Sequence, residues 1–109
     1  QSSQNQMNIS EFKLFLAESA YAPKEILEIL AKDEDYLVRA SVAQNSNVSK
    51  EILELLAKDK DSWVRESVAL NPNASKEILE ILAKDAKDKD YHVQESVAKT
   101  PNAFAEFRK

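Results

Sequence analysis

Three stretches of the chain repeat almost the same phrase, and this repetition constrains the fold more than any other feature. They read VRASVAQNSNVS at 38–49, VRESVALNPNAS at 64–75 and VQESVAKTPNAF at 93–104. A second phrase, KEILEILAKD or KEILELLAKD, begins at Lys24, Lys50 and Lys76, which stand 26 residues apart. A period of this length is typical of arrays in which small supersecondary units stack on their neighbours. We therefore expect about three such units in the chain.

Each unit contains two segments with helical periodicity. In the middle unit the first helix is expected over roughly 50–58 and the second over roughly 61–70. The first helix has an apolar arc of about 200°, which predicts that its own unit and both neighbours cover it. Glycine is absent from the chain, and the turns after the second helices are rich in asparagine. We therefore expect Asn45 and Asn71 to end these helices in the left-handed conformation.

Polar residues mark where the helices begin. An acidic pair precedes each second helix, and its second Asp is placed to cap the free N–H groups of the first turn. These pairs are Asp33 and Asp35, Asp59 and Asp61, and Asp88 and Asp90. Ser49 and Ser75 are placed to cap two of the first helices, and Pro23 stands at the equivalent position in the first unit. The third unit contains three extra residues within 85–90.

The two ends of the array are half-units. Residues 10–22 align with a second helix and its exit turn, so that Phe12 falls where Val38 stands, and their bulky apolar residues suit a terminal cap. Residues 104–109 resemble the beginning of another first helix. The expected organisation is a disordered polar tail at 1–9 and a single helical-repeat domain at 10–109, with a half-repeat at 10–22, repeats at 23–48, 49–74 and 75–103, and a partial repeat at 104–109.

Written as LAxDxDxxVRxSVAxNPNxSxExL, the unit resembles the leucine-rich repeat variant family, whose motif has the form LAxDxxxxVRxxVAxNPxxPxxxLxxL. All three units match this motif, over about 80 residues. The resemblance implies short alternating helices, some α and some 3₁₀, and no strands. The expected fold class is all-α, a right-handed superhelical solenoid of about three 26-residue two-helix repeats flanked by half-repeats. The resemblance implies little biochemistry, because such repeats serve chiefly as interaction scaffolds.

The layout is also similar to that of HEAT-type repeats, in which an Asp and an Arg six residues later form a ladder. This spacing occurs here as Asp33 to Arg39 and Asp59 to Arg65, whereas the third unit has Gln94 in place of the Arg. The resemblance implies that Arg39 and Arg65 bind their own acidic loop and neighbouring carbonyl groups. The alternative is that they bind a carboxylate of a partner.

No pattern in the chain indicates catalysis, a metal or a cofactor. The absence of Cys and Gly excludes thiolate sites and Gly-rich phosphate loops. The single histidine, His92, has no partner at metal-ligand spacing. The acidic pairs lack the 12-residue loop with Gly that an EF-hand requires. We expect a protein that is not an enzyme and has no cofactor, metal or small-molecule substrate.

The charge distribution favours neither nucleic acid nor a membrane surface as a partner. The net charge is −4, and each Lys run is interleaved with Asp or Glu, as in KDKD at 58–61. Nucleic-acid binders usually carry a basic stripe, which is missing here. No apolar run is long enough to cross a membrane, and no signal peptide is visible. The compartment stays open, with the cytoplasm as the default.

The positions at which the units differ lie on one face of the second helix, at the spacing i, i+3 and i+7. In a stacked array they line up into a strip of roughly 25–30 Å. Aromatic anchors with polar neighbours are typical of protein interfaces. The candidate protein-binding residues, which we call the variable strip, are Tyr36, Leu37, Gln44, Trp63, Glu66, Leu70, Tyr91, His92, Glu95 and Lys99.

These observations predict a non-catalytic scaffold that binds a protein or peptide through the variable strip. The main alternative is a structural spacer, or a repeat fragment of a larger protein, with no recognition role of its own. The strip would then vary only because little constrains exposed positions, and Trp63 would fold back on a neighbouring unit. Nucleic-acid binding by a HEAT-like array is less favoured because of the acidic charge.

Overall fold

The computed structural model describes residues 8–84 and 91–99. Within these ranges the chain forms helices and no strand, which confirms the all-α class. The helices are α1 (Ile9–Glu18), α2 (Lys24–Leu30), α3 (Tyr36–Ala43), α4 (Lys50–Leu56), α5 (Ser62–Leu70), α6 (Lys76–Lys84) and α7 (Tyr91–Lys99).

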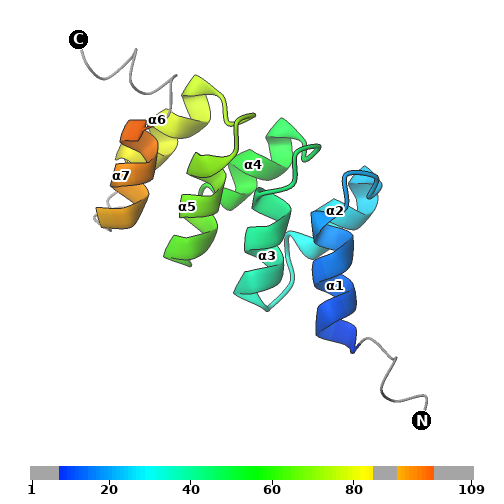
Figure 1. Cartoon of the computed structure of the whole chain (residues 1–109). Helices are drawn as coiled ribbons and strands as arrows, with labels where there is room; N and C mark the ends of the chain where they lie inside the picture. The colour runs from blue at the N-terminus through cyan, green and yellow to red at the C-terminus, as the bar shows by residue number, and fades with distance from the viewer. Residues whose placement is uncertain (1–7, 85–90, 100–109) are drawn as a thin grey trace.

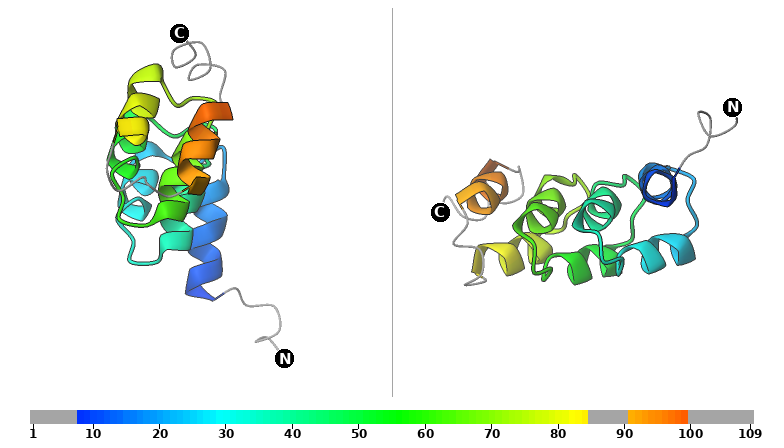
Figure 2. Two further views of the ribbon diagram at one scale, coloured as in Figure 1. Left: turned by 90° about the vertical axis from the view of Figure 1, so that its left-hand side faces the viewer. Right: turned by 90° about the horizontal axis from the view of Figure 1, so that it is seen from below.

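The helices form two layers (Figures 1 and 2). In the first, which we call the B layer, α1, α3, α5 and α7 lie side by side, and each packs against the next. In the second, the A layer, α2, α4 and α6 each contact the B-layer helices that precede and follow them in the chain. The right-hand view of Figure 2 shows the two layers edge-on, with the B-layer helices seen approximately along their axes. The B layer therefore provides the continuous contact between successive units.

The helices begin at the predicted polar caps. The hydroxyl groups of Ser49 and Ser75 each accept a hydrogen bond of 3.2 Å from the N–H group three residues later. The carboxylates of Asp35 and Asp61 accept bonds of 2.9 and 2.8 Å from the N–H groups two residues later. Pro23 precedes α2 with a φ of −61° and no side-chain cap. The predicted acidic pair of the third unit lies outside the described residues.

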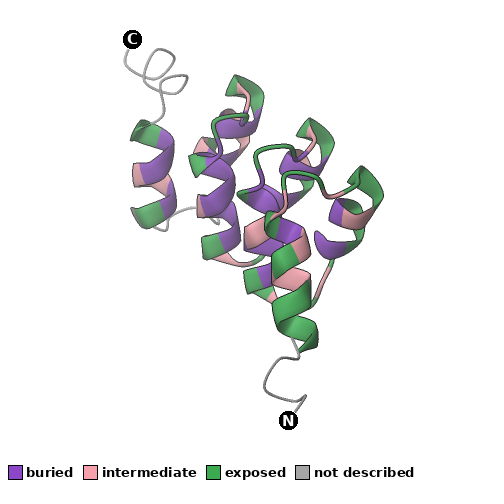
Figure 3. Ribbon diagram, turned by 45° about the vertical axis from the view of Figure 1, so that its right-hand side comes forward, coloured by how far each residue is buried: buried purple, intermediate pink, exposed green. Residues whose placement is uncertain are grey.

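One apolar cluster runs through the described units, from Ala17 in α1 to Val97 in α7. Each helix has its buried residues on one side, as Figure 3 shows. The prediction that both neighbours cover the first helix of each unit is wrong for α2 and α4, because Ile29 and Leu55 are exposed. A cleft of about 310 Å³, lined by residues of α2 and α4, lies at the surface of the A layer.

The conformation predicted for the turn asparagines is also wrong. None of the non-glycine residues in the described ranges has a positive φ. Asn71, which ends α5, has extended φ and ψ angles of −74° and 124°. These turns therefore form without glycine, because none of them needs a left-handed residue. The asparagines have a different role, which follows from their side-chain hydrogen bonds.

The ends differ in part from the expected half-units. Helix α1 begins at Ile9, inside the predicted tail, because Asn8 and Glu11 form a reciprocal capping box. Phe12 and Phe15 are more than half exposed, so the expected terminal cap leaves these rings uncovered. The remainder of the tail (1–7), the three-residue insertion within 85–90 and the partial repeat at 104–109 lie outside the described residues.

Candidate binding surface on the second helices

A buried ion pair joins the first and second units. Arg39 of α3 donates from Nε and Nη2 to the carboxylate of Asp59, at 2.8 and 3.1 Å, and both side chains are less than a tenth exposed, at 8% and 9%. Its Nη1 donates to the carbonyl groups of Asp33 and Glu34 at 2.7 and 3.0 Å. Arg39 therefore contacts its own acidic loop through carbonyl groups and the following unit through a carboxylate. The hydrogen bond with Asp59 raises the pKa of Arg39.

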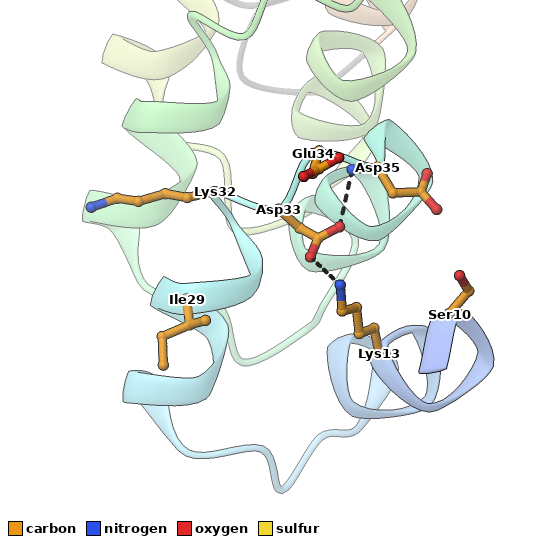
Figure 4. A pocket seen from close by; sticks show the side chains of 7 residues that line it. All are labelled: Ser10, Lys13, Ile29, Lys32, Asp33, Glu34 and Asp35. Atoms are coloured by element: carbon orange, nitrogen blue, oxygen red, sulfur yellow. Dashed lines mark hydrogen bonds and ion pairs between the residues drawn. The ribbon is translucent and has the colours of Figure 1, made fainter. Parts of the chain in front are cut away.

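The same contact occurs one unit earlier with a lysine. Lys13 of α1 donates to Asp33 at 2.7 Å, and Figure 4 shows the two side chains facing each other. This hydrogen bond raises the pKa of Lys13 and lowers that of Asp33. The role of Lys13 was not predicted from the sequence, although the alignment of Phe12 with Val38 places Lys13 at the position of Arg39.

Later positions of this ladder keep the carbonyl contacts. Arg65 donates from Nη1 to the carbonyl group of Asp59 at 2.7 Å, as Arg39 does to its own loop. Gln94, which replaces the arginine in α7, donates to the carbonyl group of Leu82 at 3.4 Å. Arg39 and Arg65 thus fix their helices against the acidic loops that precede them, whereas Gln94 contacts the last turn of α6.

A second ladder is built from asparagine. Asn45 is buried, and its Nδ2 donates to the carbonyl groups of Ala17 and Ser19 at 2.7 and 2.8 Å. Its Oδ1 accepts a bond of 2.8 Å from the N–H group of Asn47. Both hydrogens and the oxygen of the amide are therefore used. The carbonyl groups at the end of α1 are satisfied by a side chain of the next unit.

Asn71 repeats this arrangement in the following unit. Its Nδ2 donates to the carbonyl groups of Ala43 and Asn45 at 2.7 and 3.0 Å, and its Oδ1 accepts from the N–H group of Asn73 at 2.8 Å. Ala43 is 26 residues after Ala17, the acceptor of Asn45. The repeated contacts establish that α1, α3 and α5 share one register in the B layer.

Contacts between neighbouring second helices determine which way the variable strip faces. Gln44 of α3 donates to the hydroxyl group of Ser67 in α5 at 2.9 Å. Ser96 of α7 donates to a carboxylate oxygen of Glu66 in α5 at 3.4 Å. Trp63 and Leu70 lie between these two contact lines on α5 and therefore on its outward side, where they border the contact with α3.

The variable strip is narrower than the sequence predicted. Ala40, which occupies the same repeat position as Glu66, is buried, and Glu66 and Glu95 are half-buried. This position lies at the contact between neighbouring second helices. The side chain of Tyr91 is not among those described, and Tyr36 is exposed. The open centre of the strip consists of one pair per helix at i and i+7: Leu37 and Gln44, Trp63 and Leu70, and His92 and Lys99, all of which are exposed.

Three strip residues line one cleft. Gln44, Trp63 and Leu70, together with Asn71 and Pro72, enclose about 300 Å³ at the contact between α3 and α5. Trp63 is 37% exposed and Leu70 52%, so both have free apolar surface without being fully solvated. The indole and isobutyl groups offer dispersion contacts, and the amide of Gln44 adds a polar group at the rim. Such a cleft suits one apolar side chain of a partner.

A larger cleft of about 530 Å³ lies where α1 meets the first acidic loop (Figure 4). Both aspartates of this cleft already have partners, since Asp33 binds Lys13 and the N–H group of Asp35, and Asp35 caps α3. Among the described residues, no group of three or more His, Cys, Asp or Glu side chains is placed to hold a metal ion. None of the described helices is long and apolar enough to span a bilayer. Comparison of the chain with protein-family models, curated proteins and solved structures gives no match.

Proposed function

We propose that this chain is a non-catalytic scaffold that binds an extended peptide, or an extended segment of a protein, along the variable strip. On this proposal the units stack as a right-handed solenoid of the leucine-rich repeat variant type. The equivalent hydrogen bonds of Asn45 and Asn71, one unit apart, support such stacking. The strip then runs across the second helices.

One observation carries the proposal. The cleft between α3 and α5 is lined by Gln44, Trp63 and Leu70, three positions at which the units differ. The buried residues nearby, such as Val64 and Val68, recur in all three units. Variation at the walls of an open cleft, above a buried frame that recurs, is the pattern expected when the frame is constant and the contacts are adapted to a partner.

The mechanism of binding is rigid presentation of apolar anchors. An apolar side chain buried in the cleft contributes on the order of 1.5–3 kcal/mol. Trp63 and Leu70 project from one short helix that neighbouring helices hold on both sides, so little side-chain and backbone entropy is lost on binding. Affinity is expected to depend on a few anchors, because the exposed polar contacts around them contribute little.

Selection from a random nonapeptide display library tests the proposal. Peptides selected on the wild-type chain are expected to bind the variant Trp63→Ala/Leu70→Ala at least tenfold more weakly, because the cleft loses both apolar walls. The matched control is Ile29→Ala/Leu55→Ala, which removes two exposed apolar side chains from the A layer. Failure to enrich any peptide, or an equal loss of affinity in both variants, would contradict the proposal.

A second candidate is a structural segment within a longer array. It is supported by Phe12, which is exposed on α1 although the equivalent Val38 in α3 is fully buried, and by the exposed ring of Phe15. A preceding unit would cover these rings. This candidate predicts that the strip has no affinity for any peptide, so the same selection separates the two functions.

A further inference from the structure

The open centre of the strip continues onto α1. The ladder contacts of Asn45 to Ala17 and of Asn71 to Ala43 place residues 26 apart in equivalent positions. By this register Glu11 is equivalent to Leu37, and Glu18 to Gln44. Glu11 and Glu18 are both exposed. The B layer therefore presents four pairs of open positions instead of three.

The charge of these pairs changes along the layer. On α1 both positions are glutamates, although the carboxylate of Glu11 also accepts a bond of 3.1 Å from the N–H group of Asn8. On α3 and α5 the open positions are Leu37, Gln44, Trp63 and Leu70, which are uncharged, and on α7 they are His92 and Lys99. The strip is thus acidic over α1, largely apolar over α3 and α5, and carries an ammonium group over α7.

The ammonium group of Lys99 remains accessible to a partner. Its side chain is 72% exposed, and Nζ lies 3.4 Å from a carboxylate oxygen of Glu95 in the same helix. Exposed pairs of this kind contribute little to stability, and an ammonium group has three hydrogens to donate. Lys99 can therefore bind a second carboxylate without losing its contact with Glu95.

Asn45 and Asn71 cannot bind the backbone of a peptide that lies on the strip. The amide groups of Asn45 and Asn71 donate to buried carbonyl groups and accept from the N–H groups of Asn47 and Asn73. All of their hydrogens are used within the array. The selectivity of the strip must then come from its side-chain charges and its apolar cleft.

We propose that the strip takes a peptide whose charge is opposite at its two ends. Basic side chains of the peptide lie over Glu11 and Glu18, an apolar side chain enters the cleft at Trp63 and Leu70, and an acidic side chain lies over Lys99. This inference rests on the proposed function and adds the chemistry of the partner. Three helix-to-helix steps of about 8–10 Å span about 25–30 Å, the length of eight or nine extended residues. Since no backbone contact is specified, either chain direction is compatible with this arrangement.

The nonapeptide selection described above provides the test. Enriched peptides are expected to have Lys or Arg towards one end, an apolar residue in the middle and Asp or Glu towards the other end. Enriched peptides with the same charge at both ends, or with no charge preference, would overturn the inference while the proposed function stands. If no peptide is enriched over the Trp63→Ala/Leu70→Ala variant, the proposed function and the inference both fail.

A charge-reversal variant tests whether the basic end of the peptide lies over α1. Glu18→Lys is expected to lower the affinity for a selected peptide about fivefold, because an exposed attraction becomes a repulsion. The matched control is Glu28→Lys, which makes the same change on an exposed residue of α2 in the A layer and should leave the affinity unchanged. A synthetic version of the peptide with neutral residues at its basic end should bind the wild type and Glu18→Lys equally. An equal effect of Glu18→Lys and Glu28→Lys would contradict the proposed placement.

Discussion

The joints between units and the variable strip lie on the same second helices, yet their side chains are used in opposite ways. At the joints, Arg39 and Asn45 are buried and every hydrogen that the amide of Asn45 can donate has an acceptor. On the strip, Trp63, Leu70 and Lys99 keep exposed surface. Residues at the joints recur along the chain, whereas those on the strip change from unit to unit.

This difference explains why some residues repeat from unit to unit and others do not. A joint residue must match a carbonyl or carboxylate group of another unit, so a change in one unit removes a partner from a buried group in a neighbouring unit. Outward-facing apolar residues of the strip, such as Leu37 and Leu70, have no polar group of another unit to match. Repetition is therefore required by contacts between units, and variation is permitted where a helix faces outward. The following predictions measure the two regions against each other.

The largest expected effect is at the buried ion pair. Arg39→Ala should lower the free energy of unfolding by about 3–5 kcal/mol, because it leaves Asp59 buried without its partner and two carbonyl groups without donors. Urea unfolding followed by circular dichroism measures this loss. Lys32→Ala, at an exposed position near the same loop, is the control. A loss below about 1 kcal/mol for Arg39→Ala would show that the joint does not depend on this pair.

The asparagine ladder should come next. Asn71→Ala is expected to cost about 2–3 kcal/mol, since the buried carbonyl group of Ala43 loses the Asn71 donor and that of Asn45 keeps the N–H group of Val48 but loses the amide. Asn73→Ala is the matched comparison, because Asn73 is exposed and donates to one carbonyl group, that of Ser46. The same unfolding experiment should give a loss below about 1 kcal/mol for Asn73→Ala. Equal losses in the two variants would remove the distinction between a buried joint and an exposed turn.

Much of the fold could be predicted because its signals are local. The Asp35 and Ser49 caps and the helical periods follow from residues a few positions apart, and the structure confirms them. The roles of Asn45 and Asn71 were missed because their acceptors belong to the preceding unit. A turn preference is a local property, and here a contact between units overrides it.

The site was harder to predict, since it depends on how neighbouring helices are rotated. The sequence placed Glu66 on the open face, but it lies near Ser96 of the next helix. The carboxylate partner of Arg39 is likewise Asp59 of the following unit, where the spacing within one unit pointed to Asp33. The acidic start of the strip at Glu18 was missed because a half-unit offers only a weak alignment. These three features depend on how neighbouring units pack against each other. A repeat motif within one unit carries no information about that packing.

A substitution on the strip should separate folding from recognition. Trp63→Ala is expected to lower the free energy of unfolding by about 2 kcal/mol, less than Arg39→Ala, because Trp63 keeps 37% of its surface exposed. The same change should lower the affinity for a selected peptide at least tenfold. Urea unfolding and fluorescence anisotropy of a labelled peptide measure the two quantities. A stability loss as large as that of Arg39→Ala would assign Trp63 to the joints.

The smallest effect is expected at the partly exposed pair of Lys13 and Asp33. The pKa of Asp33 is lowered, so its stabilisation is present above its ordinary value of 3.8 and is lost as the pH falls through the folded value. The pKa of Lys13 is raised, so its contribution is present below 10.5 and is lost as the pH rises through the folded value. Lys13→Met should therefore be slightly less stable than the wild type at neutral pH.

Unfolding of the Lys13→Met variant and the wild type across the pH range checks this pair. The difference in stability should shrink in acid below the ordinary pKa of Asp33 and in strong base above that of Lys13. Lys24→Met, at an exposed position at the start of α2, serves as the control. A difference that does not change with pH would mean that packing of the lysine stem, not the ion pair, accounts for the effect.

The most direct test of the account is the fluorescence of Trp63, the only tryptophan in the chain. A selected nonapeptide would be titrated into the wild-type protein while the emission of Trp63 and its quenching by iodide are followed. The account predicts a saturable blue shift and protection from iodide, with the same Kd that anisotropy gives, and a much weaker response in Leu70→Ala. Saturable binding that leaves the emission and the quenching unchanged would contradict the claim that the strip is the binding surface.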